Sequence, residues 1–467
     1  MWSKEKKRIL LCVAGACILI AALRVFCSAD RLFAFVLMLW VSVVIVGMSD
    51  ISANIVMLMF LMTFFTFLLG RETVYCFFHT CDYLIADDPA ASKHTYISLL
   101  LSLAGLCVGY YLIPHEKILQ KVKWKPECSD QMLYLLRRIS MYLFYVTCPF
   151  MIIAIFCEIR YVHQVGYMES YAAVSGGVQV PFFIKLPPVM CIPAFFFFAA
   201  TFPEKKEMYP AMGLYIFQGV LGLLTGQRHR FVMPVLISVI YCMIRSRETD
   251  RWISKRHLIF LAGLTPFLLS GLFLMDHLRL GTGFEGSFLE TVSGFFASQG
   301  GSINVIKYGK LFEGGLKDVR FFSFSNIIYW VLRLEPYNGN SMECALHGYS
   351  FADRISYLIY GEAEYLRGRG AGSCYIAELY HDFGYTGIIV GSILYGSILY
   401  QISGLRKEHP LKGAFLLSIT GGMLYAPRGA FDLFVANGFS RRNIAAFGGI
   451  VSLAFLIHKI KSRKESA

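Results

Sequence analysis

Residues 32–70 read LFAFVLMLWVSVVIVGMSDISANIVMLMFLMTFFTFLLG and contain a single charged residue, Asp50. A helix needs roughly 20 apolar residues to cross the hydrocarbon core of a membrane. The stretch therefore predicts two consecutive membrane-spanning helices, joined by a short connection at Asp50.

The composition of the whole chain agrees with this stretch. Its 467 residues are 56% hydrophobic and 16% charged, with a mean hydropathy of +0.55, whereas a typical soluble domain is about 25% charged. A water-soluble fold has no place for so much apolar surface, so cytosolic enzymes and secreted domains are excluded. We predict an all-α polytopic membrane protein with about 12 transmembrane helices, at residues 9–27, 32–48, 51–70, 95–114, 139–159, 182–202, 209–224, 231–244, 258–275, 384–402, 411–427 and 443–458.

The basic residues are distributed unevenly between the two sides that these spans define. If the side of residues 1–8 is called inside, the inside segments carry 24 Lys and Arg and the short outside segments carry about ten. This positive-inside pattern predicts a protein of the cytoplasmic (inner) membrane with both termini in the cytoplasm. The Lys and Arg residues of the cytoplasmic segments then account for the net charge of +13. We therefore expect no nucleic-acid partner. The first apolar run has no convincing cleavage site, so we interpret it as a retained span.

One connection is far longer than the others. Spans one to nine occupy residues 1–275 and spans ten to twelve occupy residues 373–467, so residues 276–372 form a 97-residue extracytoplasmic loop. The loop is rich in aromatic residues, which need a surface to pack on and also stack on sugar rings. Two interpretations stay open, a domain that holds saccharide and a folded cap that only covers the spans. Its residues 321–334 (FFSFSNIIYWVLRL) predict helices in the membrane interface, where Trp and Tyr are enriched.

Three short segments place arginine at the outer ends of spans, where the positive-inside rule disfavours it. They are Gly226–Arg230 (GQRHR), Asp276–Arg279 (DHLR) and Pro427–Phe434 (PRGAFDLF). An arginine fork binds two phosphate oxygens at once. The candidate ligands of a lipid diphosphate are therefore Arg228, Arg230, Arg279 and Arg428. The alternatives are a turn that faces lipid headgroups, a helix-end anchor, and a simple ion pair between Arg428 and Asp432.

A fourth segment, Gly372–Gly387 (GSCYIAELYHDFGYTG), supplies acids and an imidazole on the same side. A helix here would place Glu378, His381 and Asp382 on one face at i, i+3 and i+4. They are candidate catalytic residues, one of them a general base. Two glycines are candidates for a bend or for close helix packing, Gly384 and Gly387. The alternative is a capped helix start with polar groups at the interface.

The sequence predicts neither a metal nor a cofactor. Its 13 cysteines include no CxxC pattern, and it contains no Asp-x-Asp pair. Two cysteine pairs outside the spans could oxidise, although neither spacing demands it, Cys76 with Cys81 and Cys344 with Cys374. No internal repeat is apparent, and the spans nearly lack the mid-helix charge that an ion-coupled transporter needs.

The order and sidedness of the four segments resemble the Wzy-type O-antigen and capsular polysaccharide polymerases, which are related in architecture to O-antigen ligases. The run from Ser373 to Gly387 resembles the family's signature before a late span, and Gly226–Phe231 resembles its Gly-x-Arg turn. Pro427–Phe434 resembles an outside segment shared with the enterobacterial common antigen polymerases. The resemblance covers the second half through motifs and the whole chain through topology, and it implies a GT-C-like helical architecture. O-antigen ligases have a His-Asn pair where this chain has Ser373 and Cys374, which favours polymerase over ligase and makes Glu378 the first candidate for the base.

The resemblance implies a metal-independent membrane glycosyltransferase. It would move a growing glycan from an undecaprenyl diphosphate carrier to a second carrier-linked repeat unit at the outer face of the membrane. The leaving group is already activated, so positioning and charge stabilisation are the main requirements. The implied partners are lipid-linked oligosaccharides and membrane lipid, with a chain-length regulator and a flippase as further candidates. Two alternatives are kept, an O-antigen-ligase-like transferase and a lipid-linked oligosaccharide flippase or transporter.

Overall fold

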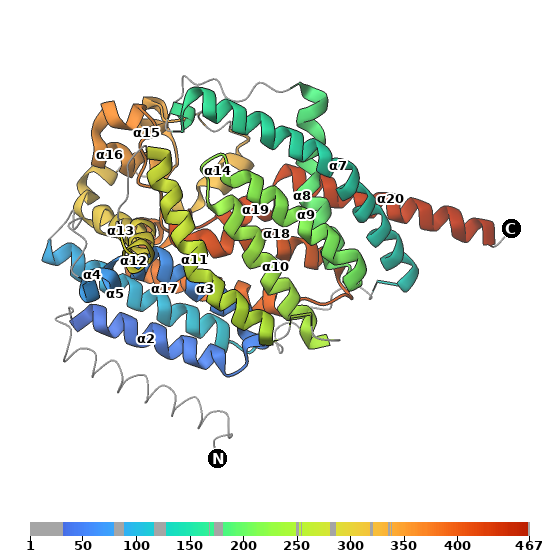
Figure 1. Ribbon diagram of the computed structural model, residues 1–467, viewed down its shortest axis with the longest axis horizontal. Helices are drawn as coiled ribbons and strands as arrows, with labels where there is room; N and C mark the ends of the chain where they lie inside the picture. The colour runs from blue at the N-terminus through green and yellow to red at the C-terminus, as the bar shows by residue number, and fades with distance from the viewer. Residues whose placement is uncertain are drawn as a thin grey trace, which may run out of the picture.

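The computed structural model describes residues 31–78, 88–115, 128–167, 169–171, 181–248, 252–253, 255–280, 286–317, 321–334, 337 and 339–465. Over these residues the chain is helical, with no β-strand. Figure 1 shows long helices packed into a bundle, with the C-terminal helix α20 extending beyond it. The fold is therefore built from helix-on-helix contacts alone.

The first half of the bundle follows the apolar runs of the sequence. Its helices are α2 (Arg31–Met48), α3 (Ile51–Phe64), η1 (Phe65–Leu69), α4 (Gly70–Phe78), α5 (Pro89–Cys107), η2 (Val108–Leu112), α7 (Asp130–Val165), η3 (Glu169–Tyr171), α8 (Phe182–Ala200), α9 (Lys205–Leu223), α10 (His229–Glu248) and α11 (Lys255–Leu280). The segments η1 and η2 are π-helical turns that continue α3 and α5, so each of these spans is one long, slightly unwound rod.

The second half begins with short helices and ends with long ones. They are α12 (Phe288–Gln299), α13 (Ser302–Leu311), η5 (Glu313–Leu316), η6 (Phe322–Phe324), α14 (Ser325–Val331), α15 (Met342–His347), α16 (Phe351–Leu366), α17 (Tyr375–Ser403), α18 (Pro410–Tyr425), η7 (Ala426–Arg428), α19 (Leu433–Gly438) and α20 (Arg441–Glu465).

The predicted spans agree with these helices. Eleven of them coincide with a described helix, and the span at 9–27 lies outside the described residues. Within the described ranges, seven helical segments are long and apolar enough to cross a membrane, and two shorter apolar helices are Ile184–Ala200 and Gly263–Leu274. The prediction of an all-α polytopic membrane protein is confirmed, and the count of twelve spans stays a prediction.

The long connection at 276–372 is largely helical where the structure describes it. It contains the end of α11 and the helices α12 to α16, of which α15 and α16 lie at the upper left in Figure 1. Helix α12 begins with a capping box, in which the Ser287 hydroxyl accepts from the Glu290 N–H and the Glu290 carboxylate accepts from the Ser287 N–H. Residues 321–334 contain η6 and α14, and Trp330 and Val331 at the end of α14 are 50% and 60% exposed. The end of α14 thus exposes apolar side chains, and its location at the membrane interface stays a prediction.

A buried ion pair fixes these short helices to the first half of the bundle. Lys307 of α13 lies 2.6 Å from Glu72 of α4, and the two side chains are 3% and 6% exposed. The backbones also approach closely, because a Cβ at Gly300 would lie 2.5 Å from the Cβ of Arg71. Burial removes water from both charges, so each depends on the other.

We expect Glu72→Ala to lower the stability of the protein by about 3–5 kcal/mol, because it leaves the Lys307 charge buried and unpaired. Thermal unfolding of the detergent-solubilised protein measures this effect. The matched control is Glu313→Ala, which breaks the exposed Lys310–Glu313 pair, where the side chains are 35% and 51% exposed, and should cost less than about 1 kcal/mol. Equal losses in the two variants would contradict the prediction.

Hydroxyl groups buried between α5 and α17 bond to one another, as apolar surroundings favour. The Ser102 hydroxyl of α5 lies 2.5 Å from the Tyr375 hydroxyl and 3.0 Å from the Ser392 hydroxyl, both on α17. A Cβ at Gly105 would lie 2.8 Å from the backbone oxygen of Ile389, so only glycine lets α5 and α17 pack this closely. These contacts hold α17 rigidly in the centre of the bundle.

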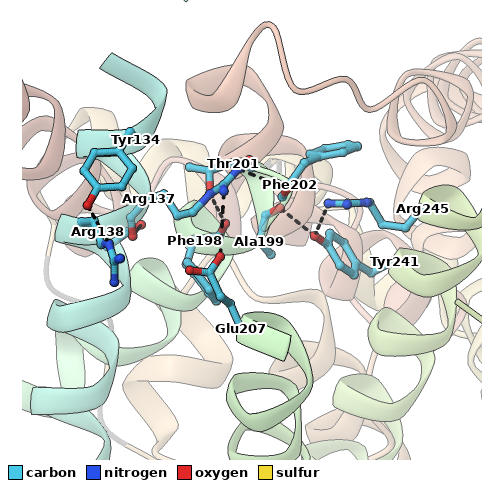
Figure 2. A network of polar contacts seen from close by, with 11 residues as sticks. Tyr134, Arg137, Arg138, Phe198, Ala199, Thr201, Phe202, Glu207, Tyr241 and Arg245 are labelled. Carbon is cyan, nitrogen blue, oxygen red and sulfur yellow. Dashed lines mark hydrogen bonds and ion pairs between the residues drawn. The ribbon is translucent and has the colours of Figure 1, made fainter. Parts of the chain in front are cut away.

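The start of α7, the end of α8 and the end of α10 meet in one network of polar contacts (Figure 2). Arg137 of α7 donates to the backbone oxygens of Thr201 and Phe202 at the end of α8, at 2.9 and 3.3 Å. Arg245 of α10 lies over the Phe202 and Trp252 rings, with centroid distances of 4.7 and 4.6 Å. The arginines thus cap a helix end and clamp Phe202, whose φ of +54° is unusual for a residue with a side chain. The network thus joins the ends of three helices that the positive-inside pattern places on one side of the membrane, and the orientation itself stays a prediction.

Candidate functional site

The turn between α9 and α10 directs its two arginines to different places. Gly226 adopts a φ of +79°, which lets the chain reverse within a few residues before α10 begins at His229. Arg228 is half-buried and lines a cavity. Arg230 instead lies 2.6 Å from Glu158 of α7 and donates from Nε to the Gln227 side-chain oxygen at 2.8 Å. The two arginines are thus not interchangeable.

The fit of Arg230 depends on small residues of α9. A Cβ at Gly222 would lie 2.9 Å from the Cβ of Arg230, and one at Gly219 would lie 2.7 Å from its backbone oxygen. Glycine at both positions allows the start of α10 to lie directly against α9. The position of the turn is therefore determined by backbone contact.

Arg428 approaches the same region from the far end of the sequence. It ends η7, which follows α18, and its Nη1 donates to the backbone oxygen of Gln299 at 3.2 Å. Its guanidinium also lies over the Phe67 ring, 5.7 Å from the centroid. Since a guanidinium has five N–H donors, a contact to one carbonyl leaves others to bind a ligand.

The cavity that contains Arg228 and Arg428 is here called cavity A. It has a volume of about 480 Å³, and its polar end is formed by Gln227, Arg228, His229, Ser298, Gln299 and Arg428. The rest of its lining is mainly apolar, with residues such as Val235, Leu236, Leu269 and Leu272 from α10 and α11. Two of its wall residues, Met62 of α3 and Leu268 of α11, are 47% and 40% exposed. Cavity A therefore joins a cationic end to an apolar passage with exposed walls.

A second cavity, here called cavity B, lies on the other side of the start of α10. It has a volume of about 470 Å³, and its polar lining includes Arg230, Asn437, Arg442 and Asn443. Three residues line both cavities, His229, Met233 and Tyr425. The His229 ring is exposed, and its centroid lies 5.5 Å from that of Tyr425. These rings separate the two cavities.

The structure places the predicted catalytic group outside the linings of both cavities. Glu378 is 1% exposed, and its carboxylate accepts from the Ser373 hydroxyl at 2.6 Å and from the Phe431 N–H at 2.7 Å. Since Phe431 follows Arg428 by three residues, Glu378 supports the segment that carries this arginine. It connects to cavity A through the backbone and does not line it.

His381 and Asp382 form a second support. The His381 ring nitrogens lie 2.7 Å from the Asp382 carboxylate and 2.8 Å from the backbone oxygen of Leu316. Both of these partners are acceptors, so the ring satisfies them only when both nitrogens carry a proton. Asp382 also accepts from the N–H groups of Phe322 and Ser323, at 3.3 and 2.8 Å. The pair holds η6 against α17.

Asp432 lies apart from Arg428 and caps α14. Its carboxylate accepts from the Asn326 side chain at 2.6 Å and from the Ile327 N–H at 2.9 Å. Burial raises the pKa of Asp432, and these hydrogen bonds partly oppose the increase. The contact ties the segment after Arg428 to the helices of the long connection, in place of the ion pair that the spacing suggested.

The remaining candidates are placed as follows. Gly384 has a φ of +64° and bends α17, whereas a Cβ at Gly387 would lie 2.5 Å from the Cβ of Phe383 on the preceding turn. Arg279 is near the end of α11, and its side chain lies outside the described residues. Cys344 and Cys374 are free thiols, and Cys81 lies outside the described residues.

Sequence reasoning missed the position of His229. The residue lies between two arginines that were selected for their charge, and no periodicity indicates that two cavities meet there. Its sequence signal is its place as the first residue of a span, directly after a glycine-containing turn.

The fold and the site together define a class of protein, a polytopic helical membrane protein with two half-buried arginines at the end of a mainly apolar cavity. A family model described as O-antigen polysaccharide polymerase Wzy matches residues 7–461. The chain belongs to this family of glycosyltransferase-type polymerases, which act on lipid-linked repeat units in O-antigen biosynthesis. No curated protein and no solved structure gives a significant match.

Proposed function

We propose that the protein transfers a growing glycan from an undecaprenyl diphosphate carrier onto a lipid-linked repeat unit at the outer face of the cytoplasmic membrane. The observation that supports this proposal most directly is cavity A. Arg228 and Arg428 are 200 positions apart in the sequence, yet they line one cavity whose walls away from its polar end are mainly apolar. A polyprenyl diphosphate has the same two parts, a charged head and an apolar chain.

Cavity A is suited to the donor. Two guanidiniums stabilise the negative charge that develops on the diphosphate as it leaves, and the apolar walls suit the first isoprene units of the carrier. The exposed wall residues Met62 and Leu268 mark the route between α3 and α11 by which the carrier enters from the bilayer. No step of this scheme requires a metal ion.

His229 is suited to accept the proton of the attacking hydroxyl. It is exposed and lines cavity A beside Arg228 and Arg428. In the transfer step, the acceptor hydroxyl oxygen forms a bond to the anomeric carbon of the donor's first sugar. The bond from that carbon to the diphosphate breaks, and its electron pair leaves with the carrier. The hydroxyl proton moves to a ring nitrogen of His229.

Glu378, His381 and Asp382 were predicted to be catalytic from the sequence, and a role as proton acceptor stays a prediction. Their contacts favour a positioning role, because the oxygens and nitrogens of the three side chains are occupied within the fold. In this scheme Glu378 holds the Arg428 segment, and the His381–Asp382 pair holds η6. The helices of 276–372 would then hold saccharide above the cavities.

We expect Glu378→Gln to lower carrier binding and glycan transfer together, by about tenfold, because it removes one of two acceptors from the support of Arg428. Binding of undecaprenyl diphosphate to purified protein and the length of the glycan product are the two measurements. The conservative control is Glu378→Asp, which keeps the carboxylate and should retain more of both. Full binding with no transfer in Glu378→Gln would instead identify Glu378 as the proton acceptor.

The membrane orientation rests on the distribution of basic residues. The predicted outside segments 225–230, 428–442 and 276–372 each contribute residues to the lining of a cavity, which supports one common side for all three. Both termini would then be cytoplasmic and the site extracytoplasmic. A flippase and a chain-length regulator are candidate partners at that face.

Gel profiles of surface glycan in a strain that lacks the protein test the proposed activity. We expect glycan of one repeat unit, since single units would still be made and displayed. A ligase-like transferase or a transporter would, on deletion, remove the single-unit glycan as well. The family membership also favours polymerase over these two alternatives.

A further inference from the structure

Cavity B has the same two-part lining as cavity A. Arg230, Arg442 and two asparagines lie at its polar end, and Ile192, Phe196 and Ile237 lie in its apolar part. Its volume of about 470 Å³ is close to the 480 Å³ of cavity A. The two cavities also share one wall, which His229, Met233 and Tyr425 form.

Three prolines line cavity B. Pro188 and Pro193 of α8 and Pro234 of α10 all lie inside helices and line the cavity. A proline inside a helix removes a hydrogen bond and bends the rod. Three such residues therefore lie in the wall of cavity B, where the backbone of α8 and α10 lacks some of its helical hydrogen bonds.

The charge at the polar end of cavity B differs from that of cavity A. Arg230 is largely neutralised by Glu158 at 2.6 Å, which leaves the exposed Arg442 as the main positive charge. The buried Asn443 bonds to the backbone oxygen of Gly438 at 3.1 Å and fixes the start of α20, where Arg442 lies. Cavity B can hold an anionic head but offers less charge to stabilise a leaving group.

We propose that cavity B binds the carrier end of the acceptor, a second polyprenyl diphosphate-linked saccharide, beside the donor in cavity A. This inference rests on the proposed function. Both substrates of such a reaction carry a lipid chain, so both must enter from the bilayer, and each chain needs its own apolar cavity. The weaker positive charge suits a diphosphate that stays bonded to its sugar throughout the transfer.

Binding stoichiometry tests the inference. Native mass spectrometry of the full-length protein in detergent, with undecaprenyl diphosphate as the probe, should show two bound molecules per chain. Gly421→Leu adds a side chain at a residue that lines cavity B, where a Cβ would meet only Ile237 at 3.6 Å, and should leave one molecule bound. Arg442→Ala should weaken the second binding event at least tenfold.

The matched control is Gly448→Leu on α20, where a Cβ would meet no atom within 4 Å, and it should still bind two molecules. Arg442 is exposed, so its alanine variant keeps the test valid if Gly421→Leu does not fold. One bound molecule in the wild type, or two in both cavity B variants, would overturn the inference.

Two further outcomes separate the possible causes. Excess phosphatidylglycerol should not displace the second molecule, and displacement would make cavity B a general lipid-headgroup site, contrary to the inference. Loss of one bound molecule in Arg428→Ala is expected from the proposed function. If that variant binds as the wild type does, the assignment of cavity A fails, whatever the result for cavity B.

Discussion

Replacing Arg428 with alanine should abolish long-chain glycan while the protein stays folded in the membrane. Its guanidinium lines cavity A with Arg228, and loss of one charge-stabilising donor at a developing anion lowers the rate by about 100- to 1,000-fold. Arg428→Lys keeps the charge but loses the two-pronged contact to phosphate, so it should be intermediate. Gel profiles of surface glycan and transfer rates in detergent measure the effect.

The control for this prediction is Arg441→Ala. Arg441 is exposed at the start of α20 and lines neither cavity, so its loss should leave chain length unchanged. Wild-type chains in Arg428→Ala would remove this arginine from the site. A loss of chain length in both variants would point to surface charge in general and not to cavity A.

The second large effect is expected for His229→Gln. Glutamine keeps a polar side chain of similar size but cannot accept a proton at neutral pH, and general-base catalysis contributes about 100- to 10,000-fold. Carrier binding should stay within a few-fold of wild type, because the arginines are untouched. The result is a fall in the transfer rate with little change in binding.

Comparison with Glu378→Gln makes the second prediction specific. Binding and transfer should fall together when the support of Arg428 is weakened, whereas only transfer should fall at His229. Normal transfer by His229→Gln, with stoichiometric carrier bound, would exclude the imidazole as the proton acceptor. Glu378 of α17 would then again be the first candidate for this role.

The apolar pattern was sufficient to predict the bundle. Each of the eleven predicted spans within the described residues coincides with a helix, because the length of an apolar run is set by the thickness of the bilayer. The short helices of 276–372 have no such requirement. Their signals are local caps, such as Ser287 with Glu290 at the start of α12, which an apolar scan does not detect.

The site was only partly predictable. The charges of Arg228 and Arg428 marked them as candidates, but residues 200 apart converge through tertiary packing that no local pattern encodes. The sequence does allow the prediction that Arg228 and Arg230 point to different places, because residues two positions apart at the start of a helix face different sides. The spacing of Glu378, His381 and Asp382 did predict a shared helix region, but spacing cannot show that hydrogen bonds within the fold already occupy them.

The ion pair between Glu72 and Lys307 has a consequence for biogenesis. The two partners are separated by 235 positions in the chain, and translation proceeds at about 5–20 residues per second. About 10–50 s therefore pass between the synthesis of Glu72 and the synthesis of Lys307. During this interval the end of the third span must stay at the water-facing edge of the bilayer, and its final depth is reached only once the lysine-bearing helix docks.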